Sequence, residues 1–235
     1  MHTLLDARHL IEVRETPGKG LGIFAKENIS RGTRIVAERP LLKVNILPSH
    51  CVDVQTPFNN LPLPAQKAYL GLYGYASNTL KKDNDWNSLS ALTRKILAIY
   101  AANHWGRDVF WLASRFNHSC IPNLHNAYNP NIKMETFHSI RDIKAGDELT
   151  VSYVSGICAR QERQEQLNKW GFQCRCPACE NTSSGIQLES KLARLAILNQ
   201  RVNMLITDKQ KLDMYQTMVA LMHSIGLVGK SLHQW

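Results

Sequence analysis

The sequence predicts a mainly β fold with added helices, an α+β arrangement with one sizeable core and a small appended part. Short apolar strands separated by turn residues occupy two blocks, residues 11–44 and 124–153. Between and after these blocks, apolar residues recur at helical spacing. A chain of 235 residues, with 44% hydrophobic and 20% charged residues, has the length and composition of such a globular protein.

The first block of strands surrounds a glycine-rich turn, with the sequence Pro-Gly-Lys-Gly-Leu-Gly at residues 17–22. Further turn residues separate the predicted strands, which cover residues 11–13, 23–25, 34–38 and 41–44. Residues 45–62 are rich in Pro, Asn and Ser, and we expect a loop there.

Two helices are predicted between the strand blocks. Apolar side chains at helical spacing predict an amphipathic helix over residues 88–103. Residues 63–75 predict a second helix, weakened by Gly71 and Gly74. Because these helices interrupt the strands, we interpret residues 46–106 as an insertion in a β core.

The second block begins with a hairpin. The sequence Asn-Pro-Asn at residues 129–131 lies between predicted strands at 124–128 and 132–137. A further strand over residues 148–153 ends at Tyr153 and alternates between two faces, which places Tyr153 with the apolar residues of one face.

The rest of the chain predicts helices. Residues 160–169 are polar and helical in pattern. Two apolar stripes predict a helical hairpin over residues 189–224, joined near Thr207 and Asp208, where Thr207 is suited to cap the second helix. The stripes need a partner surface, so we expect the hairpin to pack on the core.

Charge and composition exclude several function classes. The formal net charge of +9 is spread along the chain, so we expect a solvated basic surface and no direct nucleic-acid binding; a zinc-stabilised nucleic-acid binder, which rests on this charge alone, is the weakest alternative. We also expect a monomer. No stretch reaches the roughly 20 apolar residues that cross a bilayer. The N-terminus lacks the blocks of a secretory signal. We therefore expect no membrane association and a location in the nucleus and/or cytoplasm.

The cysteines give the sharpest local signal. Cys174, Cys176 and Cys179 lie within six residues, and a Cys-x-x-Cys pair suits tetrahedral zinc. Spacing leaves the fourth ligand open among the three other cysteines and any histidine. The alternative is a cluster of free thiols or a redox pair, but thiols this dense in a reducing compartment are usually bound to metal.

Three other motifs are weak when each is taken alone. The glycine turn at residues 18–22 is not the dinucleotide fingerprint, because the spacing differs and no helix follows. Residues 115–123 read Arg-Phe-Asn-His-Ser-Cys-Ile-Pro-Asn, which suits a turn or a ligand pocket. By itself His118 reads as a core histidine, and its side chain is poorly placed to activate nearby Cys120 as a nucleophile. Tyr153 alone reads as a core tyrosine.

The order of these motifs closely resembles the SET-domain lysine methyltransferases. The glycine turn is followed by residues 115–123, by Gly-Asp-Glu-Leu-Thr-Val-Ser-Tyr at 146–153, and by Phe-Gln-Cys-Arg-Cys-Pro-Ala-Cys at 172–179. The resemblance runs from about Glu12 to Cys179 and thus covers most of the chain.

One branch of that family is the most similar. The helical insertion, Phe172 and the helical tail look like the SET-and-MYND branch and its fungal relatives. The MYND zinc finger is missing, because Cys51 is the only cysteine before Cys120. Leu21 and Val154 depart from the residues that many relatives carry, and neither removes a group that the chemistry needs.

The resemblance implies a knotted β core, in which the strand ending at a catalytic Tyr153 passes the Asn-His-Ser-Cys segment. It implies transfer of a methyl group from S-adenosyl-L-methionine to a lysine of a histone or non-histone protein substrate. The residues implied to hold the methyl donor are Lys19, Gly20, Gly22, Asn103, Asn117, His118 and Phe172.

The resemblance also implies a complete zinc (Zn2+) site, in which Cys120 joins Cys174, Cys176 and Cys179 and the ion clips the Phe172 segment over the donor. The implied parts are a SET domain over residues 10–158, a post-SET zinc-binding segment over 159–182 and a C-terminal helical segment over 183–235, whose hairpin lies beside the peptide entrance. The alternative from another class is a catalytically silent SET module that acts as a scaffold or reader.

Overall fold

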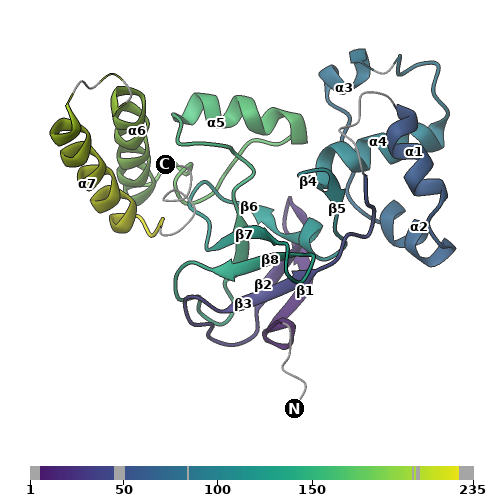
Figure 1. The fold of residues 1–235 in the computed structure, drawn as a ribbon, viewed down its shortest axis with the longest axis horizontal. Coiled ribbons are helices and arrows are strands. Elements are labelled where there is room, and N and C mark those ends of the chain that lie inside the picture. The colour runs from purple at the N-terminus through teal and green to yellow at the C-terminus, as the bar shows by residue number, and fades with distance from the viewer. Residues whose placement is uncertain (1–5, 45–50, 84, 203, 205–206, 228–235) are drawn as a thin grey trace.

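The structure is a computed structural model that describes residues 6–44, 51–83, 85–202, 204 and 207–227 (Figure 1). The strands lie together in the centre, with one group of helices on one side and a helical hairpin on the other (Figure 1). The structure therefore has the predicted α+β composition, with a β core between two helical parts.

The strands of the described residues form three sheets. The first has the order β1-β2-β9-β6: β1 Ile11–Thr16, β2 Gly20–Ala25, β9 Glu148–Val151 and β6 Asn117–His118. The second has the order β3-β8-β7: β3 Arg34–Glu38, β8 Met134–Ser139 and β7 Leu124–Asn129. A short third sheet pairs β4 His104–Trp105 with β5 Asp108–Val109.

The first hairpin forms because the glycine turn reverses the chain. Strands β1 and β2 pair in antiparallel register from Ile11 opposite Ala25 to Thr16 opposite Gly20. Gly18 and Gly20 have φ of +72° and +73°, a left-handed backbone that residues with a Cβ rarely adopt. The glycine-rich turn is therefore needed for this hairpin whatever else it does.

The two larger sheets enclose a first core. Its apolar side chains come from both sheets and from the segment that precedes β6: Ile11, Ile23, Ala25, Ile29, Ile35, Val36, Phe110, Leu112, Ala113, Phe116, Leu124, Phe137, Ile143, Leu149 and Val151. At the edge of this core, the carboxylate of Glu38 on β3 accepts hydrogen bonds from the backbone N–H groups of Leu112 and Ala113, each at 2.9 Å. The chain that leads to β6 is thus fixed to β3.

The prediction for residues 41–44 was wrong. The structure has no strand there but a single bridge between Leu42 and Val109. The N–H groups of Leu41 and Leu42 both donate to the Val109 carbonyl, and the N–H of Val44 donates to the Asp108 carboxylate. Because the hydrogen bonds converge on two residues, no ladder can extend.

The insertion is more helical than predicted. Its helices are α1 Cys51–Asn59, α2 Leu63–Leu70, α3 Asn78–Asp83 and α4 Ala91–Asn103. Residues 51–59 were expected to be loop, but Val54 and Phe58 lie one helical turn apart and are buried, and this tertiary packing outweighs the helix-breaking Pro57. The part of that expected loop at residues 45–50 lies outside the described residues.

The boundaries of α2 and α4 have local causes. Helix α2 ends at Gly71, earlier than predicted. Helix α4 begins three residues later than predicted because the Ser90 side chain accepts the Thr93 N–H at 3.1 Å and caps the helix. The helices share an insertion core: Leu42, Val44, Val54, Phe58, Tyr69, Leu72, Ile96, Leu97, Ile99 and Val109.

The remaining helices lie after β9. They are α5 Arg160–Leu167, which continues into a 3-10 turn at Asn168–Trp170, then α6 Ser183–Val202 and α7 Asp208–Ser224. The hairpin prediction is confirmed, although α6 begins six residues earlier than expected. Thr207 caps α7, with its side chain on the Gln210 N–H and the Gln210 side chain on the Thr207 N–H.

The hairpin packs against the cysteine segment and forms a C-terminal core with it. The buried members of this core are Cys120, Ile121, Val154, Leu167, Cys174, Cys176, Ala178, Cys179, Leu192, Leu195, Met218, Met222 and Ile225. In the part of the chain that the structure describes, no helix combines the length and the apolar character required to cross a bilayer.

Candidate functional site

The site is built where two distant segments run side by side. Strand β6 pairs in parallel with β9, with Asn117 opposite Thr150 and His118 opposite Val151. The N–H of Ser119 extends the ladder by donating to the Val151 carbonyl at 2.9 Å. The Asn-His-Ser-Cys segment therefore lies beside the end of the strand that leads to Tyr153.

The side chain of Asn123 fixes this pairing from the other end of the segment. Its Oδ1 accepts the Thr150 N–H at 2.8 Å, and its Nδ2 donates to the Glu148 carbonyl at 2.9 Å. Asn123 is buried, so both hydrogen bonds are shielded from water.

Tyr153 lies just beyond β9, which ends at Val151 rather than continuing to Tyr153 as predicted. Its backbone N–H leaves the ladder and donates to His118 Nδ1 at 3.0 Å. Its hydroxyl donates to the Phe116 carbonyl at 2.6 Å. The tyrosine is therefore held at both ends by residues that flank Asn117.

The Tyr153 hydroxyl stays protonated. Burial raises its pKa above the usual value of 10, and the nearby charge of Glu148 raises it further. Because the proton is directed at a carbonyl, the phenol oxygen can offer its lone pairs only as an acceptor to another group.

Four aromatic rings surround the ring of Tyr153. Their centroids lie between 4.9 and 6.5 Å from that of Tyr153, and they belong to Trp170, His118, Phe172 and Trp105. Such an enclosure is largely apolar, and an apolar environment disfavours a charged amine.

The glycine turn meets the same region through Glu148. One carboxylate oxygen accepts from Asn117 Nδ2 at 2.7 Å, and the other pairs with Lys19 Nζ at 2.8 Å. Gly22 lies against this network, because a Cβ there would lie 2.9 Å from both Asn117 Nδ2 and Glu148 Oε1. Glu148 thus joins two of the predicted donor-binding residues.

Two observations fit a polar ligand at the turn. The buried hydroxyl of Thr16, next to Gly22, has no hydrogen-bond partner, which is unusual for a buried polar atom. Above Gly20 the space is open, since no atom lies within 4 Å of the position of a Cβ. A small charged group can approach the backbone there.

Asn103 and Phe172 are placed differently from the other predicted residues. Asn103 is buried at the end of α4, and its Nδ2 donates to the carbonyls of Tyr73 at 2.6 Å and Ile99 at 2.7 Å. Both amide hydrogens are therefore used by the backbone. Phe172 is 37% exposed and lies beside His118, with ring centroids 6.2 Å apart.

A cavity of about 900 Å³ lies beside Phe172, between the insertion and α5. The residues that line it are Tyr75, Ser77, Asn78, Thr79, Leu80, Ala101, His104, Gln164, Glu165, Asn168, Lys169, Gly171, Phe172 and Gln173. Of the predicted donor-binding residues it contacts Phe172 alone.

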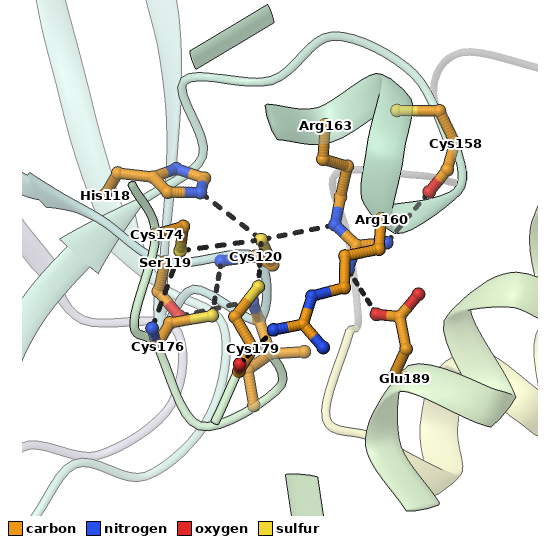
Figure 2. A network of polar contacts seen from close by, with 11 residues as sticks. His118, Ser119, Cys120, Cys158, Arg160, Arg163, Cys174, Cys176, Cys179 and Glu189 are labelled. Atoms are coloured by element: carbon orange, nitrogen blue, oxygen red, sulfur yellow. Dashed lines mark hydrogen bonds and ion pairs between the residues drawn. The ribbon is translucent and has the colours of Figure 1, made fainter. Parts of the chain in front are cut away.

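Four cysteines form a buried cluster close to Tyr153. The sulfur atoms of Cys120, Cys174, Cys176 and Cys179 all lie within 4.8 Å of one another, so together they could hold a metal ion (Figure 2). Four thiolates suit tetrahedral zinc and leave no open coordination position. Cys158 is partly exposed and lies outside this group.

The cluster shares its protons unequally. Hydrogen bonds with the other three sulfur atoms raise the pKa of Cys120, and burial adds to the effect. The hydrogen bond from Cys120 lowers the pKa of Cys176. An ion that binds all four sulfur atoms must therefore displace the remaining protons.

His118 connects the cluster to the tyrosine. Its Nδ1 accepts the Tyr153 N–H, so in the neutral ring the proton is on Nε2. Nε2 lies 3.4 Å from Cys120 Sγ and donates to it (Figure 2). One ring thus fixes the direction of a sulfur and the backbone of Tyr153.

The structure brings most of the predicted residues together, but not all at one point. The turn residues meet Asn117, and His118 meets both Tyr153 and Cys120, whereas Asn103 supports the insertion. Sequence reasoning missed Glu148, Trp105 and Trp170, which hold or enclose the others. The acidic Glu148 lies inside a recognised motif, and that position was its only signal.

The comparisons with known proteins fit this arrangement. The model of the SET domain matches residues 20–154, more than half of the chain. The chain belongs to the SET-domain family. The chain is 31% identical over 186 residues to "Histone-lysine N-methyltransferase set5" of Schizosaccharomyces pombe, a match over 79% of this chain and 55% of that protein.

Two further matches differ in extent. "SET and MYND domain-containing protein DDB_G0273589" of Dictyostelium discoideum is 42% identical over 76 residues, which are 32% of this chain and 19% of that protein. The solved SET domain of LSMT bound to lysine and AdoHcy covers 70% of this chain and 52% of that chain, with 11% identity and a TM-score of 0.46. The chain spans about half the length of the fission yeast relative.

Proposed function

We propose that this chain is a protein-lysine N-methyltransferase that transfers a methyl group from S-adenosylmethionine to a lysine of a protein substrate. The environment of Tyr153 carries the proposal: a neutral phenol fixed beside Asn117 and His118 and enclosed by aromatic rings. Membership of the SET-domain family and the name of the fission yeast relative support it.

Each group has a role that follows from its contacts. When bound, S-adenosylmethionine supplies a methyl group on a cationic sulfur. Glu148 holds Lys19 and Asn117, and these two with the open backbone at Gly20 bind the amino-acid end of the donor. His118 and Phe172 flank the other end.

The aromatic enclosure and Tyr153 act on the lysine. A free lysine has a pKa of about 10.4, and an apolar channel favours its neutral, nucleophilic form. The Tyr153 hydroxyl donates its own hydrogen to the Phe116 carbonyl, so its oxygen accepts a hydrogen bond from an N–H of the amine. This hydrogen bond aligns the lone pair of the amine nitrogen with the methyl carbon. Alignment of this kind supplies much of the rate of a displacement.

We further propose that the four-cysteine cluster holds one structural zinc ion. Its donor set and burial fit that ion, and it would join the Phe172 segment to the core through Cys120. The substrate we propose is a histone or another protein of the nucleus or cytoplasm, and the name of the Schizosaccharomyces pombe relative supports the histone.

The test is Tyr153→Phe, assayed with labelled donor and a protein lysate. We expect the variant to fold and bind donor like the parent but to transfer methyl on the order of a hundredfold more slowly, because the amine is no longer aligned. The matched control is Tyr69→Phe, which also removes a buried hydroxyl that donates to a carbonyl, that of Ile96 at 2.9 Å.

Equal methylation by Tyr153→Phe and the parent would refute the catalytic role. Equal losses in the Tyr153 and Tyr69 variants would mean that stability, not alignment, had been measured. Donor binding without transfer by the parent, across histones and lysate, would favour the scaffold alternative.

A further inference from the structure

Arg163 of α5 is a buried cation that points at the cysteine cluster (Figure 2). Its Nε donates to Cys120 Sγ at 3.3 Å, and its Nη1 donates to the Cys158 carbonyl at 2.9 Å. Its Nη2 forms an ion pair with the carboxylate of Glu189 on α6. The side chain is only 6% exposed, so the guanidinium is held on three sides.

Arg163 contacts the one cluster sulfur that lies outside residues 174–179. Cys120 comes from the β core, whereas the other three cysteines follow one another in a short segment. It receives N–H groups from both His118 and Arg163. Four thiolates on a divalent ion carry a net charge of −2, and a buried negative charge needs a nearby donor or cation.

Glu189 explains how Arg163 keeps its direction. The carboxylate is 20% exposed and therefore less buried than the guanidinium it binds. Glu189 binds Nη2 of the guanidinium, and this contact keeps Nε directed at Cys120 Sγ. A residue on the helical hairpin is thus two contacts away from a cluster sulfur.

We propose that Arg163 is a positioning residue for the zinc site, directing Cys120 Sγ toward the ion, and that Glu189 positions Arg163. The docked hairpin then sets how long the ion is retained. The inference rests on the proposed zinc ion, but not on the proposed methyl transfer. The competing explanation is an ion pair that only latches the hairpin to α5.

The experiment measures release of zinc from the full chain to an excess of chelator. We expect Arg163→Met to release zinc about 10- to 100-fold faster, the usual effect of removing an outer partner of a metal ligand. Glu189→Gln should accelerate release less, because its amide oxygen still accepts from Arg163.

Arg163→Met/Glu189→Gln tests whether an unpaired Glu189 carboxylate, and not the lost contact with Cys120, releases the zinc. Removing both charges leaves no unpaired buried ion, so the fold should survive. We expect the double variant to lose zinc as fast as Arg163→Met, since Glu189 acts only through Arg163. A return to the parent's rate would assign the faster release to the unpaired Glu189 carboxylate left in Arg163→Met, and would overturn the proposal.

Arg175→Gln is the matched control. Arg175 lies between two cluster cysteines and is exposed, and none of its described contacts is with a sulfur. The change in charge equals that of Arg163→Met, so we expect the parent's rate. Equal acceleration in both variants would overturn the proposal, as would a parent that holds no zinc.

A cobalt-substituted protein gives a second readout. A hydrogen bond lowers the energy of a sulfur lone pair, so its loss should move the sulfur-to-cobalt absorption band to longer wavelength in Arg163→Met. The band should stay in place in Arg175→Gln. An unmoved band in Arg163→Met would show that Arg163 does not act on the sulfur.

Discussion

Gly22 lies where the site leaves no room for a side chain. A Cβ there would be 2.5 Å from Thr16 Oγ1 as well as close to Asn117 and Glu148. We expect Gly22→Ala to cost about 1–3 kcal/mol of stability through overpacking. We also expect weaker donor binding, because Asn117 and Glu148 must move apart. Thermal unfolding and calorimetry with the donor measure the two effects.

Gly18→Ala controls for the backbone of the same turn. Its φ is +72°, but no atom lies within 4 Å of the added Cβ. The expected cost is about 1–2 kcal/mol for a left-handed residue with a side chain, without a change in donor affinity. Equal losses of donor affinity in both variants would contradict a specific role for the space at Gly22.

For single residues, the sequence predicted which side chains belong to the site better than it predicted the contacts that they make. The four cysteines lie together, but their own spacing left the fourth position open, and only the family resemblance pointed to Cys120. Glu148 could not be assigned, because one carboxylate among 19 acidic residues has no distinctive spacing. The role of Asn103 at the donor stays a prediction, and its two amide hydrogens are used by the backbone.

Two elements far apart in sequence clamp the segment that carries Phe172. Trp170 Nε1 donates to the Ala102 carbonyl at 2.9 Å, and the Tyr73 hydroxyl donates to the Trp170 carbonyl at 3.3 Å. Gly171, with φ +76°, packs so closely that a Cβ would lie 2.2 Å from the ring of Tyr75. The insertion and α5 therefore set the position of Phe172 together.

Gly171→Ala tests this clamp. The added methyl should push the segment away from Tyr75 and displace Phe172, so we expect weaker donor binding with zinc retained. Gly156→Ala is the control, because Gly156 has almost the same φ, +75°, and open space around it. Donor titrations and zinc content decide the outcome. Unchanged donor affinity in Gly171→Ala would mean that Phe172 does not contact the donor.

Prediction of the elements succeeded where the pattern was local. The β1–β2 hairpin and the capped helix α7 follow from glycines and from Thr207, whose effects act within a few residues. Helix α1 was missed because its stability comes from burial of Val54 and Phe58 against α4, which no local pattern reveals. The passage of a strand end through a knot stays a prediction.

The cysteine cluster should tie the C-terminal core to the rest of the molecule. Cys120→Ser should lose zinc and lower the melting temperature, since metal binding and local folding are coupled. Cys158→Ser removes a cysteine outside the cluster and should keep both. Metal analysis and thermal unfolding measure this. Full zinc content in Cys120→Ser would remove Cys120 from the ligand set.

Zinc retention should depend on pH in one direction. Because burial and hydrogen bonds raise the pKa of Cys120 when no ion is bound, protons compete with the metal for this sulfur. We expect zinc affinity to fall as pH is lowered from about 7 to about 5, because the rising proton concentration competes with the ion for each sulfur. Competition with a chelator across that range measures the slope, and a flat profile would contradict thiolate ligation.

The separation in sequence between Cys120 and the other three cluster cysteines has a consequence during synthesis. Cys174 follows it by 54 positions, and translation at roughly 5–20 residues per second takes about 3–10 seconds to cover them. During that interval Cys120 has none of the three partner sulfurs of the cluster. Any product that stops before Cys174 keeps the tyrosine and the glycine turn but has no set of sulfurs to close. Zinc can therefore be loaded only after Cys174, Cys176 and Cys179 have been synthesised, whatever time the core strands have had to pair.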